Sequence, residues 1–368
     1  MPLSPLFQPV AFGDLPGWND DHHAEALAAF RLSAVYATGA TYRTGTLGVE
    51  HAAFTDAFAA ALRLDGPNDQ QARHFFETHF QPMRIVPDDA ASGFVTGFYE
   101  PQVNASPVRT DAFKVPLLAP PADLAKIDDG NRPAGLDPYL AFGRQTPDGI
   151  VEYHDRRAIE EGALGDRAEA LAWVADPVDA FFIHVQGAAR LVMPDGRMRR
   201  ITYAAKSGQR FTGAGRILVD LGEIPLAAVT MQSIRAWLAA HPHRVDDILR
   251  QNRSYIFFRE AAVDDAGLGP IAAAKVPLTA GRSMAVDRLL HTFATPFHVV
   301  APSLDAFGSA PFRRLMIAQD TGSAIVGPAR GDLFAGSGDA AGEIAGVIRH
   351  DADIVALVPV GLVPGAAA

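Results

Sequence analysis

The segment QDTGSAIVGPARGDLFAGSG, residues 319–338, decides the fold and the chemistry that the sequence predicts. Asp320 ends an alternating strand pattern, a glycine-rich turn follows, and Asp332 stands beside the apolar pair Leu333 and Phe334. A carboxyl group packed against apolar side chains loses hydration, which raises its pKa and suits it to act as a general acid near neutral pH. A nearby Asp320 would raise the pKa of Asp332 further, whereas Arg330 would lower it by contacting the carboxylate.

A structural interpretation of the same segment stays open. Aspartates beside turns commonly bind backbone amides, so both carboxylates are also typical of a turn without catalytic function. The glycines at 336, 338 and 342 have the spacing G-x-G-x-x-x-G, which differs from the dinucleotide fingerprint, and no clear βαβ unit surrounds them. We interpret them as turn and packing glycines.

The flanking sequence predicts a unit of strands and helices. Strands are expected at GFVTGFYEPQV (93–103), which is aromatic and β-branched, at RLMIAQD (314–320), and at 354–359. Helices are expected where apolar residues recur at helical spacing, namely at 19–37, 51–64, 69–80 and 339–347.

The middle of the chain predicts a second, β-rich unit. After loops rich in Pro, Asp and Gly, we expect a strand at 180–185 and a hairpin that turns at Pro194-Asp195-Gly196. Helices at 231–240 and 245–251 close this unit, and SYIFF (254–258) resumes the strand pattern. The prediction is therefore a discontinuous outer domain, 1–105 plus 250–368, with residues 106–249 inserted. We expect a cleft between the two domains, where ligands commonly bind.

Composition restricts the class of partner. The 368 residues carry a formal charge of −10, which argues against nucleic acid or an anionic membrane as the main partner. No cysteine is present, so disulfides, thiolate nucleophiles and cysteine-based zinc sites are excluded. The sequence as given shows no signal peptide and no apolar run long enough to span a bilayer. We expect a targeting segment to have been removed or not included.

Other candidate constellations favour structural interpretations. The twelve histidines show no metal-ligand spacing, and no G-x-S-x-G elbow supports a serine nucleophile. A basic patch across the middle hairpin is typical of a solvated face, although it is also compatible with an acidic ligand. Its members are Arg197, Arg199, Arg200, Lys206 and Arg210. Phe98 and Tyr99 are able to stack on sugar rings, yet strand aromatics are more often core residues.

Several motifs together resemble the MltA family of membrane-bound lytic murein transglycosylases, over nearly the whole chain. They are LPGWNDD (15–21), GFYEP (97–101), VQG (185–187), DG (195–196), YAAKSG (203–208), NRSYIFFRE (252–260), VPLTAGRSMAVDR (276–288), QDTGSAI (319–325) and GDLFAGSG (331–338). The last two resemble the 3D domain, named for its aspartates. The sequence departs from the family pattern at VQGAA, where the family has VQGSG, and lacks the lipoprotein cysteine.

This resemblance implies a fold and a set of site residues. The fold class is mainly β with peripheral helices, as a double-psi β-barrel with a second β domain inserted. Asp332 is then the catalytic acid and base, with Asp320 beside it. The substrate-binding residues implied are Thr96, Tyr99, Gln186 and Asp287. No cofactor and no metal are expected.

The resulting hypothesis is cleavage of the β-1,4 bond between N-acetylmuramic acid and N-acetylglucosamine in peptidoglycan, with closure of a 1,6-anhydro ring. Two alternatives remain: a plain glycan hydrolase in which Asp320 activates water, and a non-catalytic cell-wall glycan-binding protein. The partners expected are peptidoglycan glycan strands and other cell-wall enzymes. The location expected is the periplasm or the outer membrane.

Overall fold

A computed structural model describes residues 2–87, 92–262, 265, 267–308 and 311–363. The chain forms two compact units, Met1–Tyr99 with Gly267–Ala368, and Glu100–Ala266. β4 (Gln102–Ser106) and β12 (Ile256–Ala261) hydrogen-bond into the sheet of the second of these units. None of the helices within these described ranges has the length and apolar character needed to cross a membrane.

The outer unit is built on one eight-stranded sheet in the order β1-β2-β17-β14-β15-β13-β16-β3. A further pairing joins β17 to β3, so the six strands from β17 to β3 form a closed ring of hydrogen-bonded neighbours. Such closure leaves these six strands without a free edge. The strands are β1 (Phe7–Pro9), β2 (Phe80–Ile85), β3 (Gly93–Glu100), β13 (Ser283–Ala285), β14 (Pro296–Ala301), β15 (Phe312–Asp320), β16 (Arg330–Ser337) and β17 (Arg349–Pro359).

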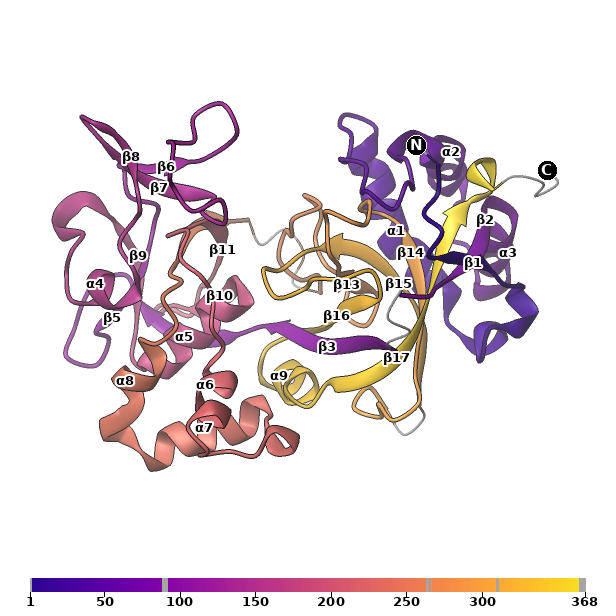
Figure 1. Ribbon diagram of the computed structural model, residues 1–368. Coiled ribbons are helices and arrows are strands. Elements are labelled where there is room, and N and C mark those ends of the chain that lie inside the picture. The colour runs from indigo at the N-terminus through magenta and orange to yellow at the C-terminus, as the bar shows by residue number, and fades with distance from the viewer. Residues whose placement is uncertain (1, 88–91, 263–264, 266, 309–310, 364–368) are drawn as a thin grey trace. The chain divides into compact units, whose positions relative to one another are not determined.

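The helices of the outer unit confirm the sequence prediction. They are α1 (His23–Ala37), α2 (Thr55–Arg63), α3 (Asp69–His79) and α9 (Asp339–Gly346). Asn68 and Gln71 form a reciprocal capping box that explains where α3 begins. Figure 1 shows α1 to α3, in indigo, gathered on one side of the sheet. The chain is therefore rich in sheet with associated helices, as expected.

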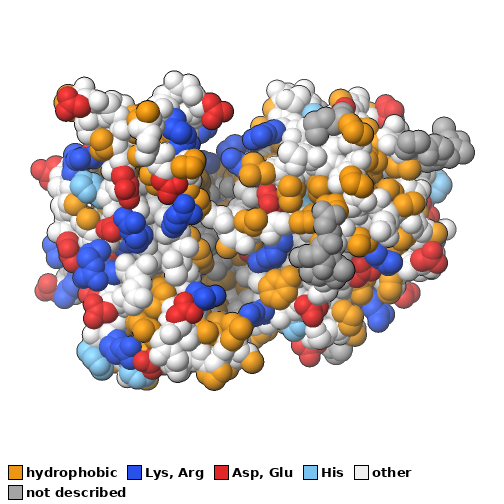
Figure 2. Space-filling view, viewed as in Figure 1, with side chains coloured by type: hydrophobic (Ala, Val, Ile, Leu, Met, Phe, Trp, Pro, Cys, Tyr) orange, Lys and Arg blue, Asp and Glu red, His pale blue; other side chains and the backbone are white. Residues whose placement is uncertain are grey.

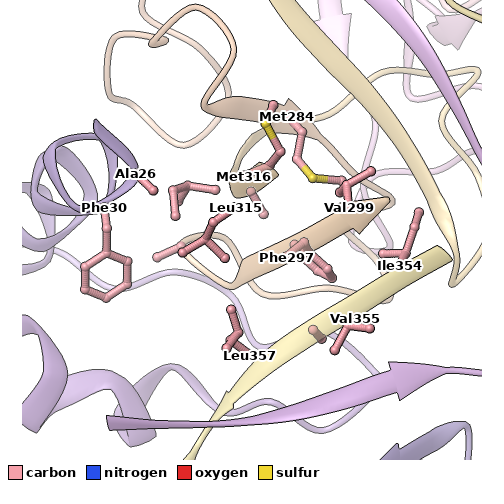
Figure 3. Close-up of a cluster of buried hydrophobic side chains, with 14 of the residues drawn as sticks. Ala26, Phe30, Met284, Phe297, Val299, Leu315, Met316, Ile354, Val355 and Leu357 are labelled. Carbon is pink, nitrogen blue, oxygen red and sulfur yellow. The ribbon is translucent and has the colours of Figure 1, made fainter. Parts of the chain in front are cut away.

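The core of the outer unit fills the space between α1 and the strands. Phe30 of α1 and Phe297 of β14 are completely buried, and Leu315 and Leu357 are buried with them. Figure 3 shows Met284 of β13 in this cluster with Phe297, Val299 and Ile354. Because neighbouring side chains of a strand point to opposite faces, Met284 in the core directs Ala285 to the other face.

A buried arginine fixes the start of β13. Arg282 is only 1% exposed and forms two contacts with the Asp21 carboxylate, at 2.9 and 3.0 Å. Asp21 also accepts a hydrogen bond from the Leu315 amide at 2.7 Å, and Arg282 reaches Glu25 at 3.0 Å. Burial acts to raise the pKa of Asp21, but Arg282, the Leu315 amide and His23 together outweigh it and the pKa is lowered. The N-terminal segment thereby holds β13 and β15 in register.

The inserted unit contains a six-stranded sheet in the order β12-β11-β10-β4-β9-β5 and a three-stranded sheet β6-β7-β8. Its other strands are β5 (Val115–Leu118), β6 (Leu124–Lys126), β7 (Phe142–Thr146), β8 (Gly149–Val151), β9 (Ala170–Val174), β10 (Ala188–Val192) and β11 (Met198–Lys206). Its helices are α4 (Arg156–Glu160), α5 (Pro177–Gln186), α6 (Ala214–Asp220), α7 (Met231–Ala240) and α8 (Val245–Leu249). The hairpin predicted at Pro194-Asp195-Gly196 is confirmed as β10 and β11.

The strand predicted at 180–185 is wrong, because these residues lie in α5. The Asp176 side chain caps the helix by accepting from the Val178 amide, Pro177 occupies the first turn, and Gly187 ends it with a φ of 77°. A short apolar run does not distinguish a buried helix from a strand, and the flanking Asp-Pro and Gly were the signals that identify the helix. The prediction that His184 lies in a strand is wrong for the same reason.

We expect Asp21→Ala to lower the free energy of unfolding by about 3–5 kcal/mol, because it leaves the Arg282 charge buried without its main partner. Glu25→Ala is the matched control, since it removes the other carboxylate of the same arginine but at a position that is 60% exposed. Its expected cost is about 0–1 kcal/mol. Urea denaturation measures both, and equal losses would contradict the different roles of the two carboxylates.

Candidate functional site

Asp320 and Asp332 both lie opposite one residue of β13. Ala285 is the register partner of Asp320 on parallel β15 and of Asp332 on antiparallel β16. Directly paired residues project to the same face of a sheet, so the two carboxyl groups share a face with a single methyl group between their strands. Two strand spacings separate their Cα atoms, or about 10 Å. The segments of sequence that carry these aspartates are therefore brought together by β13.

Apolar side chains share the face of the sheet on which Asp332 lies. A buried cluster lies on this face and consists of Phe98, Leu278, Ala285, Ile325 and Phe334. The rings of Phe98 and Phe334 are 5.2 Å apart. Burial raises the pKa of Asp332, against the opposing effects of the Arg330 charge and the Thr96 hydroxyl. The raised pKa fits a carboxyl that carries a proton into the reaction.

Asp320 is the last residue of β15, as the sequence predicts. Burial raises its pKa to about 6, backbone hydrogen bonds from Thr321 and Ala273 oppose this, and the Asp332 charge adds to it. The Ala273 amide donates to Asp320 Oδ1 at 3.1 Å. The structural interpretation of the segment therefore holds in part, since Asp320 binds backbone amides while also sensing the charge of Asp332.

Thr96 connects Asp332 to Arg330. The Thr96 hydroxyl donates to Asp332 Oδ1, and Arg330 Nη2 donates to the same hydroxyl at 2.6 Å. Arg330 also donates to the carbonyl of Gly331, and its guanidinium carbon lies 5.4 Å from the centre of the Phe94 ring. Arg330 thus acts on Asp332 across the threonine hydroxyl. Asp332 lies within a strand, not in the turn where the sequence suggested it.

Asp287 has a different environment. Its two carboxylate oxygens accept hydrogen bonds from the amides of Leu289 and Gly327, each at 3.0 Å. His291, whose pKa burial lowers to about 4, binds the Pro328 carbonyl at 2.8 Å. These contacts hold the loop that joins the two catalytic candidates. Within the described residues, no three His, Cys, Asp or Glu side chains group as metal ligands.

The other two predicted residues lie in different places. Tyr99 is 7% exposed and packs on α9, where a Cβ added to Gly342 would meet its ring at 2.9 Å. Gln186 is the half-buried last residue of α5 in the inserted unit. Thr96 is therefore the predicted binding residue that the structure brings against Asp332. Substrate contacts by Tyr99 and Gln186 stay predictions.

The basic patch predicted across the middle hairpin is divided among carboxylates of its own unit. The pairs are Arg197 with Asp195, Arg199 with Glu260, Arg200 with Glu100, and Arg210 with Asp137. Lys206 lies 5.4 Å from the centre of the Tyr139 ring. Figure 2 accordingly shows basic and acidic side chains intermingled over the visible face of this unit. The arginines of the patch are thus engaged within the unit.

Sequence reasoning missed the role of Ala285 and the position of Arg330 behind Thr96. The signal was the alternation F-x-T-x-F at 94–98 and R-x-D-x-F at 330–334. In each strand the first, third and fifth side chains of the motif lie on the same face. The two motifs predict contacts between their side chains only if β3 and β16 are known to be neighbours in the sheet.

Two family models match the chain. The MltA specific insert domain matches residues 94–259, and the 3D domain matches residues 282–358. The membrane-bound lytic murein transglycosylase A of Escherichia coli (strain K12) is 30% identical over 261 residues. This alignment spans 69% of the chain and 62% of the length of that relative.

Solved structures are similar over nearly the full chain. A membrane-bound lytic murein transglycosylase from Agrobacterium tumefaciens is 51% identical with a TM-score of 0.91, covering 96% of this chain and 97% of that one. MltA from Neisseria gonorrhoeae is 31% identical with a TM-score of 0.77, covering 96% and 92%. E. coli MltA with bound chitohexaose is 26% identical with a TM-score of 0.68, covering 98% and 95%.

We expect the Asp320 carboxyl to titrate near pH 6, and at a lower pH in the Asp332→Asn variant. The sign follows because ionised Asp332 disfavours a second negative charge at Asp320, and the amide removes that charge. Carbon-13 NMR of labelled aspartate side chains measures both titrations. An unchanged Asp320 titration in the variant would show that the two carboxyl groups do not interact.

Proposed function

Because this chain belongs to the MltA family of lytic murein transglycosylases, we propose that it cleaves the β-1,4 bond between N-acetylmuramic acid and N-acetylglucosamine in peptidoglycan. The observation that carries the proposal is the pair of partly buried carboxyl groups on one face of the ring of strands, with the raised pKa of Asp332. The bound chitohexaose of the E. coli relative supports a glycan substrate.

Asp332 begins the reaction as the protonated acid. It gives its proton to the glycosidic oxygen of the departing N-acetylglucosamine as the bond from that oxygen to muramoyl C1 breaks. The C6 hydroxyl oxygen of the same muramoyl residue then bonds to C1, and its proton passes to the Asp332 carboxylate. The products are a free sugar hydroxyl and a 1,6-anhydro ring, no water is consumed, and Asp332 is again protonated.

One carboxylic acid suffices for these reaction steps because the nucleophile, the C6 hydroxyl, is part of the substrate. Glycosidases that use water or form a covalent intermediate normally need a second carboxylate in a defined role. A well-oriented intramolecular hydroxyl reaches effective molarities of about 10⁵–10⁸ M, which replaces much of the contribution of a second catalytic group. Proper orientation of the muramoyl ring is thus the main demand on the binding site.

Asp320 supports the reaction through the negative charge of its carboxylate. Its pKa of about 6 allows it to ionise near neutral pH, and because the repulsion between the two carboxylates is reciprocal, its negative charge favours the protonated form of Asp332. The same charge stabilises the positive charge that develops on the sugar ring when the glycosidic bond breaks. The Ala273 amide, which binds Asp320 Oδ1, holds the carboxylate in place for this role.

The closed ring of six strands supports the double-psi β-barrel expected for the outer domain. By the same resemblance, the catalytic aspartates lie in this domain and the inserted domain binds glycan. Thr96, Tyr99, Gln186 and Asp287 are proposed to line or support the binding groove. The relatives named membrane-bound support association with the envelope. The location proposed is the periplasm or the outer membrane, and the partners proposed are glycan strands and other cell-wall enzymes.

A plain hydrolase is the second candidate, because Asp320 supplies a second carboxyl group on the same face as Asp332. In that reaction Asp320 activates a water molecule, and the muramoyl product keeps a reducing end. Mass spectrometry separates the two reactions, since each hydrolysis product is one water heavier than the anhydro product.

Digestion of purified sacculi by the wild type is expected to release 1,6-anhydro muropeptides. Asp332→Asn is expected to slow their release by about 10²–10⁴-fold, because the amide cannot transfer the proton. Asp353→Asn, on β17 in an ion pair with Arg84, is the matched control and is expected to digest normally. Reducing-end products would establish the hydrolase, and release by Asp332→Asn at the wild-type rate would show that Asp332 is not the acid. Absence of any release by the wild type would leave a non-catalytic wall-binding role.

A further inference from the structure

Three side chains of β3 match three of β16 in the same order along both strands. Phe94 contacts Arg330, Thr96 contacts Asp332, and Phe98 contacts Phe334. Glycine occupies one of the two intervening positions on each strand. A Cβ on Gly331 would lie 2.6 Å from Met284, and one on Gly97 would lie 2.6 Å from Ile348. The two glycines therefore allow the close packing of β3 and β16 that aligns the three pairs of side chains.

We propose that Arg330 is a positioning residue that determines which oxygen of Asp332 carries the catalytic proton. The hydroxyl of Thr96 is the intermediary, and the proton resides on Oδ2. This inference rests on the proposed role of Asp332 and adds a residue that sequence reasoning treated only as a direct partner of the carboxylate.

The hydrogens available on Arg330 and Thr96 place the proton of neutral Asp332 on Oδ2. A guanidinium has donors and no acceptor, so the 2.6 Å contact between Arg330 Nη2 and Thr96 Oγ1 uses a hydrogen of the arginine. The threonine hydroxyl has one hydrogen, and Asp332 Oδ1 is the acceptor that it contacts among the described residues. Oδ1 must then offer a lone pair to that hydrogen. A carboxylic acid has one proton, so the proton of neutral Asp332 is on Oδ2.

Arg330 is itself held from three sides. Its guanidinium lies against the Phe94 ring, donates to the Gly331 carbonyl and donates to Thr96. A hydroxyl that already accepts from a fixed guanidinium has a restricted range of directions for its own hydrogen. Without Arg330 the hydroxyl is free to rotate and to accept a proton from Asp332, which would place that proton on Oδ1.

The contacts of Thr96 and Arg330 also stabilise the ionised state of Asp332. After Asp332 gives up its proton, Thr96 still donates to Oδ1, and the Arg330 charge behind it stabilises the carboxylate. Oδ2 remains available to accept the proton of the muramoyl hydroxyl. A direct contact between Arg330 and Asp332 would stabilise the carboxylate more strongly and oppose its initial protonation. The intervening hydroxyl therefore moderates the effect of the arginine.

The charged groups on the elements around Asp332 are few. The charge of Arg330 on β16 opposes the raised pKa of Asp332, Asp320 on β15 is coupled to Asp332 by charge repulsion, and the β13 residue paired with Asp332 is the uncharged Ala285. Arg349 on β17 is the backbone partner of Thr96, while Asp339 and Glu343 on α9 have exposed side chains. Loss of the Thr96 hydrogen bond or of the Arg330 charge therefore raises the pKa of Asp332.

The test compares Thr96→Val and Arg330→Met with the wild type in kcat, KM and pH profile. Each variant is expected to lower kcat by about 10–100-fold with KM unchanged, because a hydrogen bond to a charged group is lost. Since the protonated acid is the active form, each also moves the high-pH limb of the profile to higher pH. Thr96→Ser and Arg330→Lys are expected to restore much of kcat.

A double variant shows whether Arg330 acts through Thr96. In the Thr96→Val background, Arg330→Met is expected to lower the maximal kcat no further. An additional loss as large as in the wild type would overturn the proposal. Arg84→Met, which removes the arginine paired with Asp353, is the control for loss of a charge and is expected to leave the kinetics unchanged.

Titration of the labelled Asp332 carboxyl by carbon-13 NMR gives a readout that does not depend on turnover. Its pKa is expected to rise in Thr96→Val and in Arg330→Met, and to stay at the wild-type value in Arg84→Met. Unchanged titration in the first two variants would refute the inference even if the enzyme is a transglycosylase. Absence of anhydro products from the wild type would refute the proposed function and leave this titration informative.

Discussion

The pairing of Ala285 with both aspartates is the constraint on which the rest of the site depends. It requires β13 to lie between β15 and β16, parallel to the first and antiparallel to the second. A one-residue slip of β13 would turn Ala285 into the core and present Met284 between the carboxyl groups. The long Met284 side chain in the core opposes that slip, because its exposure would remove apolar surface from the cluster shown in Figure 3.

The N-terminal segment secures this register although it lies more than 250 residues away along the chain. Asp21 binds both the Arg282 guanidinium and the Leu315 amide, so a single carboxylate connects the residue before β13 to β15. Ser283 also donates to Gln319, whose amide group reaches α1. The helical region therefore contributes to the site by fixing strand positions, in addition to covering the core.

The sequence predicted local features well and non-local pairing poorly. The helices of the outer unit, the Pro-Asp-Gly hairpin and Asp320 at a strand end all depend on near neighbours, and the structure confirms them. The helix α5 was missed because an apolar run has no clear period, although Asp176 and Gly187 mark its ends. Thr96 and Asp332 are 236 positions apart in the sequence, and no local pattern specifies that they meet.

The two aspartates differ in their hydrogen-bond partners, and this difference separates their functions. Asp320 binds a backbone amide, a donor that cannot rotate, and so is suited to remain a fixed charge. Asp332 binds the Thr96 hydroxyl, which donates to Oδ1 in both protonation states and leaves Oδ2 to lose and regain the proton. A group that must lose and regain a proton in one catalytic cycle needs a partner that tolerates both states. Burial favours the neutral acid, and Thr96 with Arg330 favours the carboxylate, so the balance between them allows Asp332 to serve in both steps.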